Sequence, residues 1–305
     1  MRVSVILCTY AESMYEDFTA AAKSILTQTY DHVELVVVVD GNDSLYEMVN
    51  RDFAGREDVV LYCNDKNRGL SESRNIGVEL SSGDVVAFMD DDAVADPRWI
   101  EELVSAYREH DVIAAGGKMT PKWVAGKPSF LPEEFYWLVG VTHRGFADGP
   151  GEVRNTFGSN ISFRRKVFEE LGGFDIEMGR QGDKNLQSEE TLLCAEMKKE
   201  FEQGVWYNPD AIVEHKVFEY RTKPKWLLER AFWQGYSKRA MTVLLPDSGS
   251  EETVFLNELL FKYIPERIRN ALLKLSVIEA LKLLMLIVFT SFVGFGYLYG
   301  LTKWR

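Results

Sequence analysis

The first half of the chain alternates short apolar runs with helix-like stretches. The apolar runs cover residues 3–8, 33–39, 59–64, 85–89 and 112–115, and the stretches between them cover residues 16–28, 45–53, 71–80 and 97–109. The apolar runs are nearly continuous and do not alternate with polar residues, which is typical of parallel strands that are covered on both faces. This pattern predicts an α/β fold built on a doubly wound, Rossmann-like, mostly parallel sheet.

Polar residues follow four of the apolar runs at the point where each run ends. Thr9 and Tyr10 follow the first run, residues 40–43 the second, residues 64–68 the third and residues 90–92 the fourth. The carboxyl ends of parallel strands meet at one edge of a sheet, where open α/β sheets bind their ligands. We therefore expect these four clusters to share one crevice.

Three consecutive aspartates, Asp90, Asp91 and Asp92, follow the fourth run. Carboxylates placed together against a buried strand repel one another unless a cation or several hydrogen-bond donors compensate. In an extended segment the first and third side chains point the same way, so Asp90 and Asp92 are the expected ligands of one Mg²⁺ or Mn²⁺, with Asp91 turned away. The alternative is a solvated acidic turn that caps the following helix.

The chain of 305 residues is acidic, with a formal net charge of −12. This charge argues against a non-specific grip on nucleic acid phosphates, so no nucleic acid partner is expected. An acidic surface fits the high-salt cytoplasm of halophilic archaea, although ordinary acidic enzymes reach similar values. The three cysteines are widely separated and form no CxxC pair, so neither a disulfide framework nor a zinc site is predicted, and a reducing compartment fits.

The C-terminal part predicts attachment to a membrane. Residues 283–302 carry no charge and are numerous enough to cross a bilayer as a helix, whereas a soluble core helix of this length would carry a polar stripe. The preceding segment mixes apolar and basic residues, which predicts an amphipathic juxtamembrane stretch or, equally, an ordinary packed helix. The basic residues before the span, and an N-terminal apolar run too short for a signal peptide, predict a single-pass protein of the cell membrane with its catalytic part in the cytoplasm.

Six motifs occur in a fixed order along the chain. They are Thr9-Tyr10, Asp40, Ser73-Arg74-Asn75-Ile76-Gly77, Asp90-Asp91-Asp92, Gly172-Gly173-Phe174-Asp175 and Glu189-Glu190. With this ordered set the chain resembles the family 2 glycosyltransferases, inverting enzymes with the GT-A fold, over residues 3–238. The expected organisation is a catalytic domain at residues 1–240, a juxtamembrane segment at 241–282 and a transmembrane helix at 283–302.

The resemblance implies a donor site at the strand ends. Asp40 is similar to the aspartate that reads the uracil of a UDP-sugar, and Arg74 to a contact with the base or the diphosphate. Thr9, Tyr10 and Asp91 fall among the implied donor contacts. The family often has Asp-Asp-Gly-Ser after the second strand, whereas this chain has Val39-Asp40-Gly41-Asn42, so Asp43 is an alternative to Asp40. A structural salt bridge is the alternative role for Asp40 and Arg74.

The resemblance also implies catalytic and acceptor residues further along the chain. An inverting transfer needs a carboxylate to take the proton of the acceptor hydroxyl, and Glu190 is the implied base, with Glu189 as the other candidate. The helix dipole also favours acids in a first turn, so stabilisation alone is the alternative. Asp175 resembles a residue near the acceptor sugar, although a helix C-cap explains its two preceding glycines equally well.

Three further features are less specific. His215 resembles a histidine that ligates the metal or contacts the diphosphate in relatives, although a lone histidine often has no such role. Residues 178–188 are strongly polar, as in an active-site flap or a plain surface loop. Residues 230–239 combine aromatic and basic side chains, which suits an acceptor channel, a lipid phosphate contact or simple packing.

These features together predict a metal-dependent hexosyltransferase. It would move a sugar, for example a hexuronic acid such as glucuronic acid, from a UDP-sugar to a polyprenyl- or dolichol-phosphate-linked glycan, in protein N-glycosylation or surface-glycan assembly. The acidic composition and the layout are similar to haloarchaeal transferases of lipid-linked N-glycan assembly. Two alternatives stay open: a polyprenyl-phosphate sugar synthase, whose nucleophile is the lipid phosphate itself, and an inactive, membrane-tethered glycan-binding or scaffold protein.

Overall fold

The computed structural model describes residues 1–176, 189–244 and 250–304. The predicted polar loop at 178–188 lies outside these residues. The chain divides into two compact units, each made of two segments. Unit 1 comprises Met1–Pro121 and Gly149–Lys216, and unit 2 comprises Lys122–Asp148 and Val217–Arg305.

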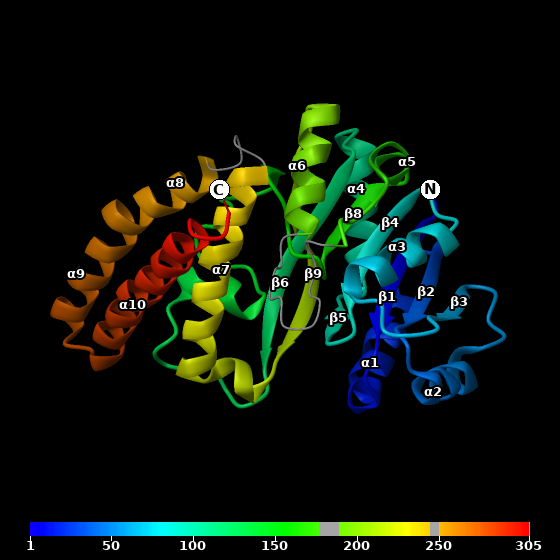
Figure 1. Cartoon of the computed structure of the whole chain (residues 1–305), viewed down its shortest axis with the longest axis horizontal. Coiled ribbons are helices and arrows are strands. Elements are labelled where there is room, and N and C mark those ends of the chain that lie inside the picture. Colours follow the sequence, from blue (N-terminus) through cyan, green and yellow to red (C-terminus); the bar gives the residue numbers. More distant parts are fainter. Residues whose placement is uncertain (177–188, 245–249, 305) are drawn as a thin grey trace. The chain divides into compact units, whose positions relative to one another are not determined.

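Unit 1 is built on a sheet whose nine described strands run in the order β3-β2-β1-β4-β8-β6-β9-β5, with β7 paired to β9 (Figure 1). The strands are β1 Val3–Thr9, β2 Val33–Val39, β3 Val59–Cys63, β4 Val85–Asp90, β5 Ala93–Ala95, β6 Ala114–Trp123, β7 Gly151–Val153, β8 Ile161–Arg164 and β9 Val205–Val217. The helices are α1 Tyr15–Leu26, α2 Asp43–Phe53, α3 Leu70–Leu80, α4 Trp99–Glu109, α5 Lys166–Leu171 and α6 Glu189–Phe201, with a short 3₁₀ turn, η1, at Glu12–Met14.

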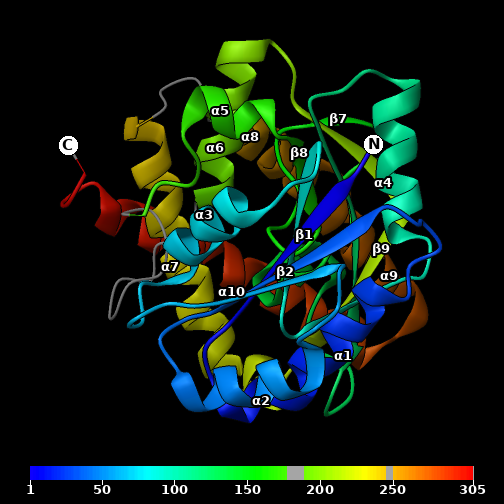
Figure 2. The same ribbon diagram turned by 90° about the vertical axis from the view of Figure 1, so that its right-hand side faces the viewer.

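The first four predicted strands are confirmed and are parallel. β1 lies between β2 and β4, with Val5 opposite both Leu35 and Ala87, and β2 also pairs with β3. Figure 2 shows β1 and β2 side by side. Nearly all side chains of β1, β2 and β4 are buried, as the continuous apolar runs require. The carboxyl ends of these strands therefore lie at one edge of the sheet.

The fifth apolar run differs from the expected parallel strand. β6 begins at Ala114 and pairs antiparallel with β8, which is itself antiparallel to β4. An apolar run that is buried on both faces gives no information about strand direction, so the sequence pattern could not reveal this reversal. Gly117 lets β6 approach β9 closely, because a Cβ atom there would lie 1.8 Å from the carbonyl oxygen of Ala211.

The core of unit 1 contains an aromatic cluster beneath the strand ends. Phe88 of β4 contacts Phe163, Phe168 and Phe174 through edge-to-face ring pairs with centroids 5.0 to 6.3 Å apart. All four rings belong to the buried core of the sheet. This packing fixes the end of β4, which carries the three aspartates.

Unit 2 is helical. Its described residues form the 3₁₀ segments η2 Glu133–Val139 and η3 Glu219–Thr222, then α7 Pro224–Leu244, α8 Ser250–Glu258, the π-helical η5 Leu259–Tyr263, α9 Ile264–Lys274 and α10 Val277–Gly300. The side chain of Ser276 caps α10 by accepting a hydrogen bond from the amide of Glu279. Among the described residues, α10 is the helix that is long and apolar enough to cross a membrane.

Candidate active site

The carboxyl ends of β1, β2 and β4 bring the predicted donor residues of unit 1 to one edge. Thr9 ends β1, Asp40 follows β2 and Asp90 ends β4, and Cys8 lies directly opposite Asp90 in the sheet. The Thr9 hydroxyl donates a hydrogen bond of 2.7 Å to the carboxylate of Asp91. Tyr10, the next residue, extends its side chain into solvent. Side chains from three parallel strands therefore gather at this edge of the sheet.

Asp40 is buried and holds the segment that leads into α3. Its carboxylate accepts hydrogen bonds from the Asn64 side chain at 2.7 Å and from the backbone amides of Arg68 and Gly69 at 2.8 and 2.9 Å. Gly69 has a φ of +88°, a conformation that glycine adopts without strain. Asp43, the alternative, is an exposed residue of the first turn of α2. Asp40 thus holds the segment before α3 in place at this edge of the sheet.

The three aspartates have three different partners. Asp90 pairs with Arg74 at 2.9 Å, Asp91 accepts from Thr9, and Asp92 lies 3.2 Å from Nε2 of His215. The extended segment ends at Asp90, and Asp91 and Asp92 form a turn before β5. The expectation that strand alternation orients Asp90 and Asp92 together therefore starts from the wrong local geometry. Register explains the histidine contact, because His215 of β9 pairs with Ala93, next to Asp92.

Negative charge accumulates around this turn. Burial raises the pKa of Asp91 to about 7; the hydrogen bond from Thr9 opposes this shift, and the charges of Asp92 and Asp90 add to it. A cation at this position would relieve the repulsion.

The residues present fit a divalent metal that the donor completes. No three His, Cys, Asp or Glu side chains within the described part of the chain form a ready-made metal site. Mg²⁺ characteristically binds through one or two carboxylates together with substrate phosphates. Asp90 and Asp92 would supply the carboxylates, and His215, beside Asp92, would supply an imidazole.

Arg74 of α3 connects the aspartate turn to α6. Its guanidinium is buried against the rings of Phe88 and Phe174, donates to the Gly158 carbonyl at 3.3 Å and pairs with Asp90. It also lies 3.5 Å from Glu189 and 3.6 Å from Glu190. Burial lowers the pKa of Arg74, but Asp90, Glu190 and Glu189 together outweigh burial and raise it above its usual value. The structure therefore brings together residues that the sequence separates by more than 100 positions.

The Gly-Gly-Phe-Asp segment is held by the residue after Arg74. The Asn75 side chain donates to the carbonyl of Phe174 at 2.9 Å and accepts from its amide at 2.8 Å. Gly172 is the left-handed C-cap of α5, and a Cβ atom at Gly173 would lie 2.6 Å from the Asn75 side chain. The glycines are thus accounted for by the C-cap and by contact with Asn75. Asp175 itself is exposed at the end of the segment.

Glu189 and Glu190 begin α6 but differ in exposure. The Glu189 side chain is 6 % exposed, whereas that of Glu190 is 20 % exposed. A base must reach the acceptor hydroxyl, so Glu190 is better placed for proton transfer. The choice of Glu190 as the base stays a prediction.

Gly158 and Ser159 are site residues that sequence reasoning missed. Ser159 accepts a hydrogen bond of 2.9 Å from the amide of Asp90 through its hydroxyl, and Gly158 lies against the Glu190 carboxylate. The run Thr156-Phe157-Gly158-Ser159-Asn160 before β8 combines small and polar residues in a way that could have indicated a close approach.

We expect Gly158→Ala to lower kcat by about a hundredfold, because small displacements of a reacting group are costly. The new Cβ atom would lie 2.0 Å from Oε1 of Glu190 and would push the carboxylate aside. The clash is with the end of a flexible side chain, so the melting temperature should change little. Steady-state kinetics and a thermal melt check this prediction. The matched control is Gly149→Ala, also in unit 1, where no atom lies within 4 Å of the new Cβ and the backbone is not left-handed. Wild-type kcat in Gly158→Ala would contradict the placement of Glu190.

Comparisons with known proteins agree with this geometry. The model of the family "Glycosyl transferase family 2" matches residues 4–172, so the chain belongs to glycosyltransferase family 2. It is 50 % identical over 302 residues to the glucosyl-dolichyl phosphate glucuronosyltransferase of Haloferax volcanii, a match that covers 99 % of this chain and 96 % of the relative. It is also 25 % identical over 178 residues to the succinoglycan biosynthesis protein ExoM of Rhizobium meliloti, which covers 58 % of this chain and 54 % of ExoM.

Solved structures show the same fold. Residues 1–349 of TarS from S. aureus superimpose with a TM-score of 0.54 at 18 % identity, covering 96 % of this chain and 81 % of that structure. A complex of the same TarS fragment with UDP gives the same TM-score and covers 92 % and 77 %. The predicted GT-A fold is thereby confirmed.

Proposed function

We propose that the protein transfers glucuronic acid from UDP-glucuronic acid to glucosyl-dolichyl phosphate. The observation that carries the proposal is the 50 % identity to the Haloferax volcanii enzyme over nearly the whole length of both chains. This match includes the helices of unit 2 as well as the family 2 region. The UDP carried by the TarS complex supports a uridine-linked donor.

The residues of unit 1 have distinct parts in the proposed reaction. Asp40 reads the uracil and keeps the 64–69 segment in place through its three hydrogen bonds. Thr9, Tyr10 and Asp91 line the donor side. Glu190 takes the proton of the attacking hydroxyl, and Asp175 contacts the acceptor sugar.

Asp90, Asp92 and His215 would hold the Mg²⁺ or Mn²⁺. The metal would supply positive charge to the departing nucleotide diphosphate. Arg74 keeps Asp90 and Glu190 at fixed positions on either side of its guanidinium. Its burial argues for positioning these groups, in place of the donor contact that the sequence suggested.

The test of the proposal is a matrix of donors and acceptors with the purified full chain. We expect turnover with UDP-glucuronic acid and glucosyl-dolichyl phosphate, and little with UDP-glucose, GDP-mannose or dolichyl phosphate that lacks the glucose. Mass spectrometry of the lipid product gives the number of sugars. Transfer to bare dolichyl phosphate would establish the sugar synthase alternative instead. Absence of nucleotide release with every pair would support the scaffold alternative.

Metal removal should abolish transfer. After treatment with EDTA we expect activity to fall to background and to return on addition of Mn²⁺ or Mg²⁺. Asp92→Asn should lower kcat by about two to three orders of magnitude, because electrostatic stabilisation of developing charge is commonly worth this much. Asp210→Asn changes an exposed aspartate of unit 1 and is the control. Full activity of metal-free protein or of Asp92→Asn would overturn the metal assignment.

The acceptor places the reaction at a membrane. Unit 2 supplies the means, because α10 is long and apolar enough to enter a bilayer. We place the catalytic unit on the cytoplasmic side, where nucleotide sugars are available.

A further inference from the structure

Helix α9 of unit 2 buries a charged side and exposes an apolar side, the reverse of a helix on a soluble protein. Its Arg267 is only 4 % exposed and bonds to Glu133 and Glu134 of η2 and to Glu279 of α10. Its leucines point the other way, since Leu272 is 70 % exposed. A helix on the surface of a soluble protein shows the opposite arrangement. The outer side of α9 is therefore built to face something apolar.

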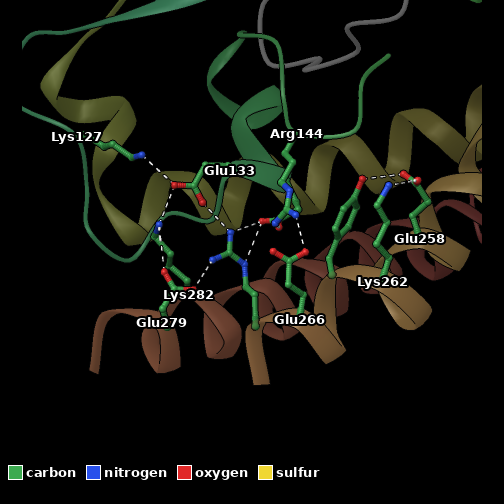
Figure 3. A network of polar contacts seen from close by, with 11 residues as sticks. Lys127, Glu133, Arg144, Glu258, Lys262, Glu266, Glu279 and Lys282 are labelled. Carbon is green, nitrogen blue, oxygen red and sulfur yellow. Dashed lines mark hydrogen bonds and ion pairs between the residues drawn. The ribbon is translucent and has the colours of Figure 1, made fainter. Parts of the chain in front are cut away.

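An ion-pair network fixes this orientation (Figure 3). Lys282 of α10 forms an ion pair with Glu133 of η2 at 2.7 Å. Arg144 forms ion pairs with Glu134 of η2 and with Glu266 of α9. Several opposite charges are thus paired on the inner side of α9 and at the start of α10. The apolar side chains of both helices remain on the outside.

Helix α10 continues the same surface. Exposed apolar side chains recur every three residues from Ile278 to Ile287 and lie again at Phe295 and Leu298, so they occupy one broad side of the helix. We call the exposed apolar side chains of α9, of its C-cap Leu275 and of α10 the outer face; it includes Leu272, Leu275, Leu284, Ile287, Phe295 and Leu298. The opposite side of α10 packs on α7 and on η2, where Phe289 contacts Phe135.

Contact with α7 argues against a helix that crosses the bilayer. Gly235 of α7 lies against the backbone of Val293, and Gly296 of α10 lies against the carbonyl of Phe232, so the two helices touch through glycines. In a spanning helix, Val293 to Gly300 would lie about 15 to 25 Å into a hydrocarbon core about 30 Å thick. The adjoining part of α7 carries Lys238 and Arg239, and charges at such depth are costly.

We propose that α9 and α10 lie in the plane of the membrane, with the outer face in the cytoplasmic leaflet of an anionic bilayer. The proposal deepens, and rests on, the membrane attachment proposed above; it replaces the predicted span by an interfacial pair of helices. Charge supports this occupant. Residues 259–305 contain seven basic and two acidic residues in a chain of net charge −12, and both acids, Glu266 and Glu279, belong to the inner network.

Exposed bases at the outer face suit phospholipid headgroups. Arg269 is exposed next to Ile268. Lys262, next to Phe261, is exposed as well and pairs with Glu258 of α8 at 3.1 Å. Long basic side chains can keep their charge at the headgroups while their stems lie along apolar surface. A second copy of the chain fits the outer face less well than a membrane does. Pairing two outer faces would place these bases beside one another, and the apolar outer face offers them no opposite charge.

Flotation with vesicles tests the attachment. The full chain should float with vesicles of phosphatidylglycerol and phosphatidylcholine, and more weakly with phosphatidylcholine alone. The double variant Leu272→Glu/Leu275→Glu should reduce binding at least about tenfold, because it removes two leucine side chains that would be buried in the lipid when the protein binds. Leu80→Glu, at an exposed leucine of α3, is the control. Unchanged melting curves show that the variants fold.

Topology separates the in-plane arrangement from a span. A peptide tag after Arg305 should be removed by protease in sealed, cytoplasmic-side-out membrane vesicles, as fast as a tag before Met1. A C-terminal tag that is protected until detergent is added would overturn the proposal in favour of a span. Wild-type flotation of the double variant, or a stable dimer that does not float, would also overturn it. Neither assay depends on sugar transfer, so their failure is distinct from failure of the proposed function.

Discussion

Replacing Glu190 by Gln should lower kcat by about two to four orders of magnitude, the usual contribution of a general base. The amide keeps the size of the side chain but has no capacity to take the proton of the acceptor hydroxyl. Binding of the nucleotide donor should be unchanged, because Glu190 lies on the α6 side of Arg74 and not at the strand ends. Single-turnover kinetics and titration of UDP binding together measure both quantities.

Two variants of the same helix serve as controls for Glu190→Gln. Glu200→Gln removes an exposed carboxylate near the end of α6 and should behave as wild type. Glu189→Gln removes a buried carboxylate that also faces Arg74, so its main effect should be on stability. If Glu189→Gln lost activity and Glu190→Gln did not, the base assignment would pass to Glu189.

Glu190→Gln also discriminates between the transferase and the sugar synthase. A lipid phosphate is already ionised when it attacks the donor, so a synthase needs no base for its nucleophile. Near-normal transfer by Glu190→Gln to dolichyl phosphate would therefore favour the synthase. Loss of transfer to glucosyl-dolichyl phosphate would favour attack by a sugar hydroxyl.

The parallel half of the fold could be predicted because its signal is local. Runs such as 33–39 are fully apolar, and their lengths and spacing define strands and helices without reference to the rest of the chain. The antiparallel half could not be predicted in the same way. The direction of β6 depends on its pairing with β8, a contact between distant residues that leaves no periodic trace.

The site was predictable as a set of residues but not as an arrangement. The sequence indicated Asp90, Arg74 and Glu190, and it left both a donor contact and a structural salt bridge open for Arg74. The structure buries Arg74 between the other two, and only tertiary packing of α3 against Phe88 and Phe174 creates that position. Gly158 was missed for a similar reason, because its significance lies in what it touches.

Helix α10 shows what hydropathy alone leaves out. Residues 283–302 have the length and composition of a span, and the structure confirms an apolar helix there. Composition does not reveal what lies beside a helix. The contact of α10 with the charged helix α7 appears only in three dimensions, and it is the reason for proposing an in-plane arrangement.

Replacing Arg74 by Met should have a large effect on stability. It would leave Asp90, Glu189 and Glu190 without their shared cation, and removing one partner of a buried ion pair typically costs about 3 to 5 kcal/mol. Denaturant unfolding followed by a probe in unit 1 measures this loss. Arg51→Met is the matched control, because Arg51 forms an exposed pair with Asp52, and such pairs contribute about 1 kcal/mol or less.

The same substitution tests what Arg74 does in the reaction. If Arg74 positions Glu190 and Asp90, then Arg74→Met, assayed where it remains folded, should lower kcat about a hundredfold with little change in the KM for the donor. A direct contact with the donor would instead raise that KM. Positioning also predicts that the two substitutions are not additive. In a protein that already carries Glu190→Gln, replacing Arg74 should lower kcat little further, because the carboxylate that Arg74 positions is no longer there to act as a base. Additive losses in the double variant would show that Arg74 acts independently of Glu190.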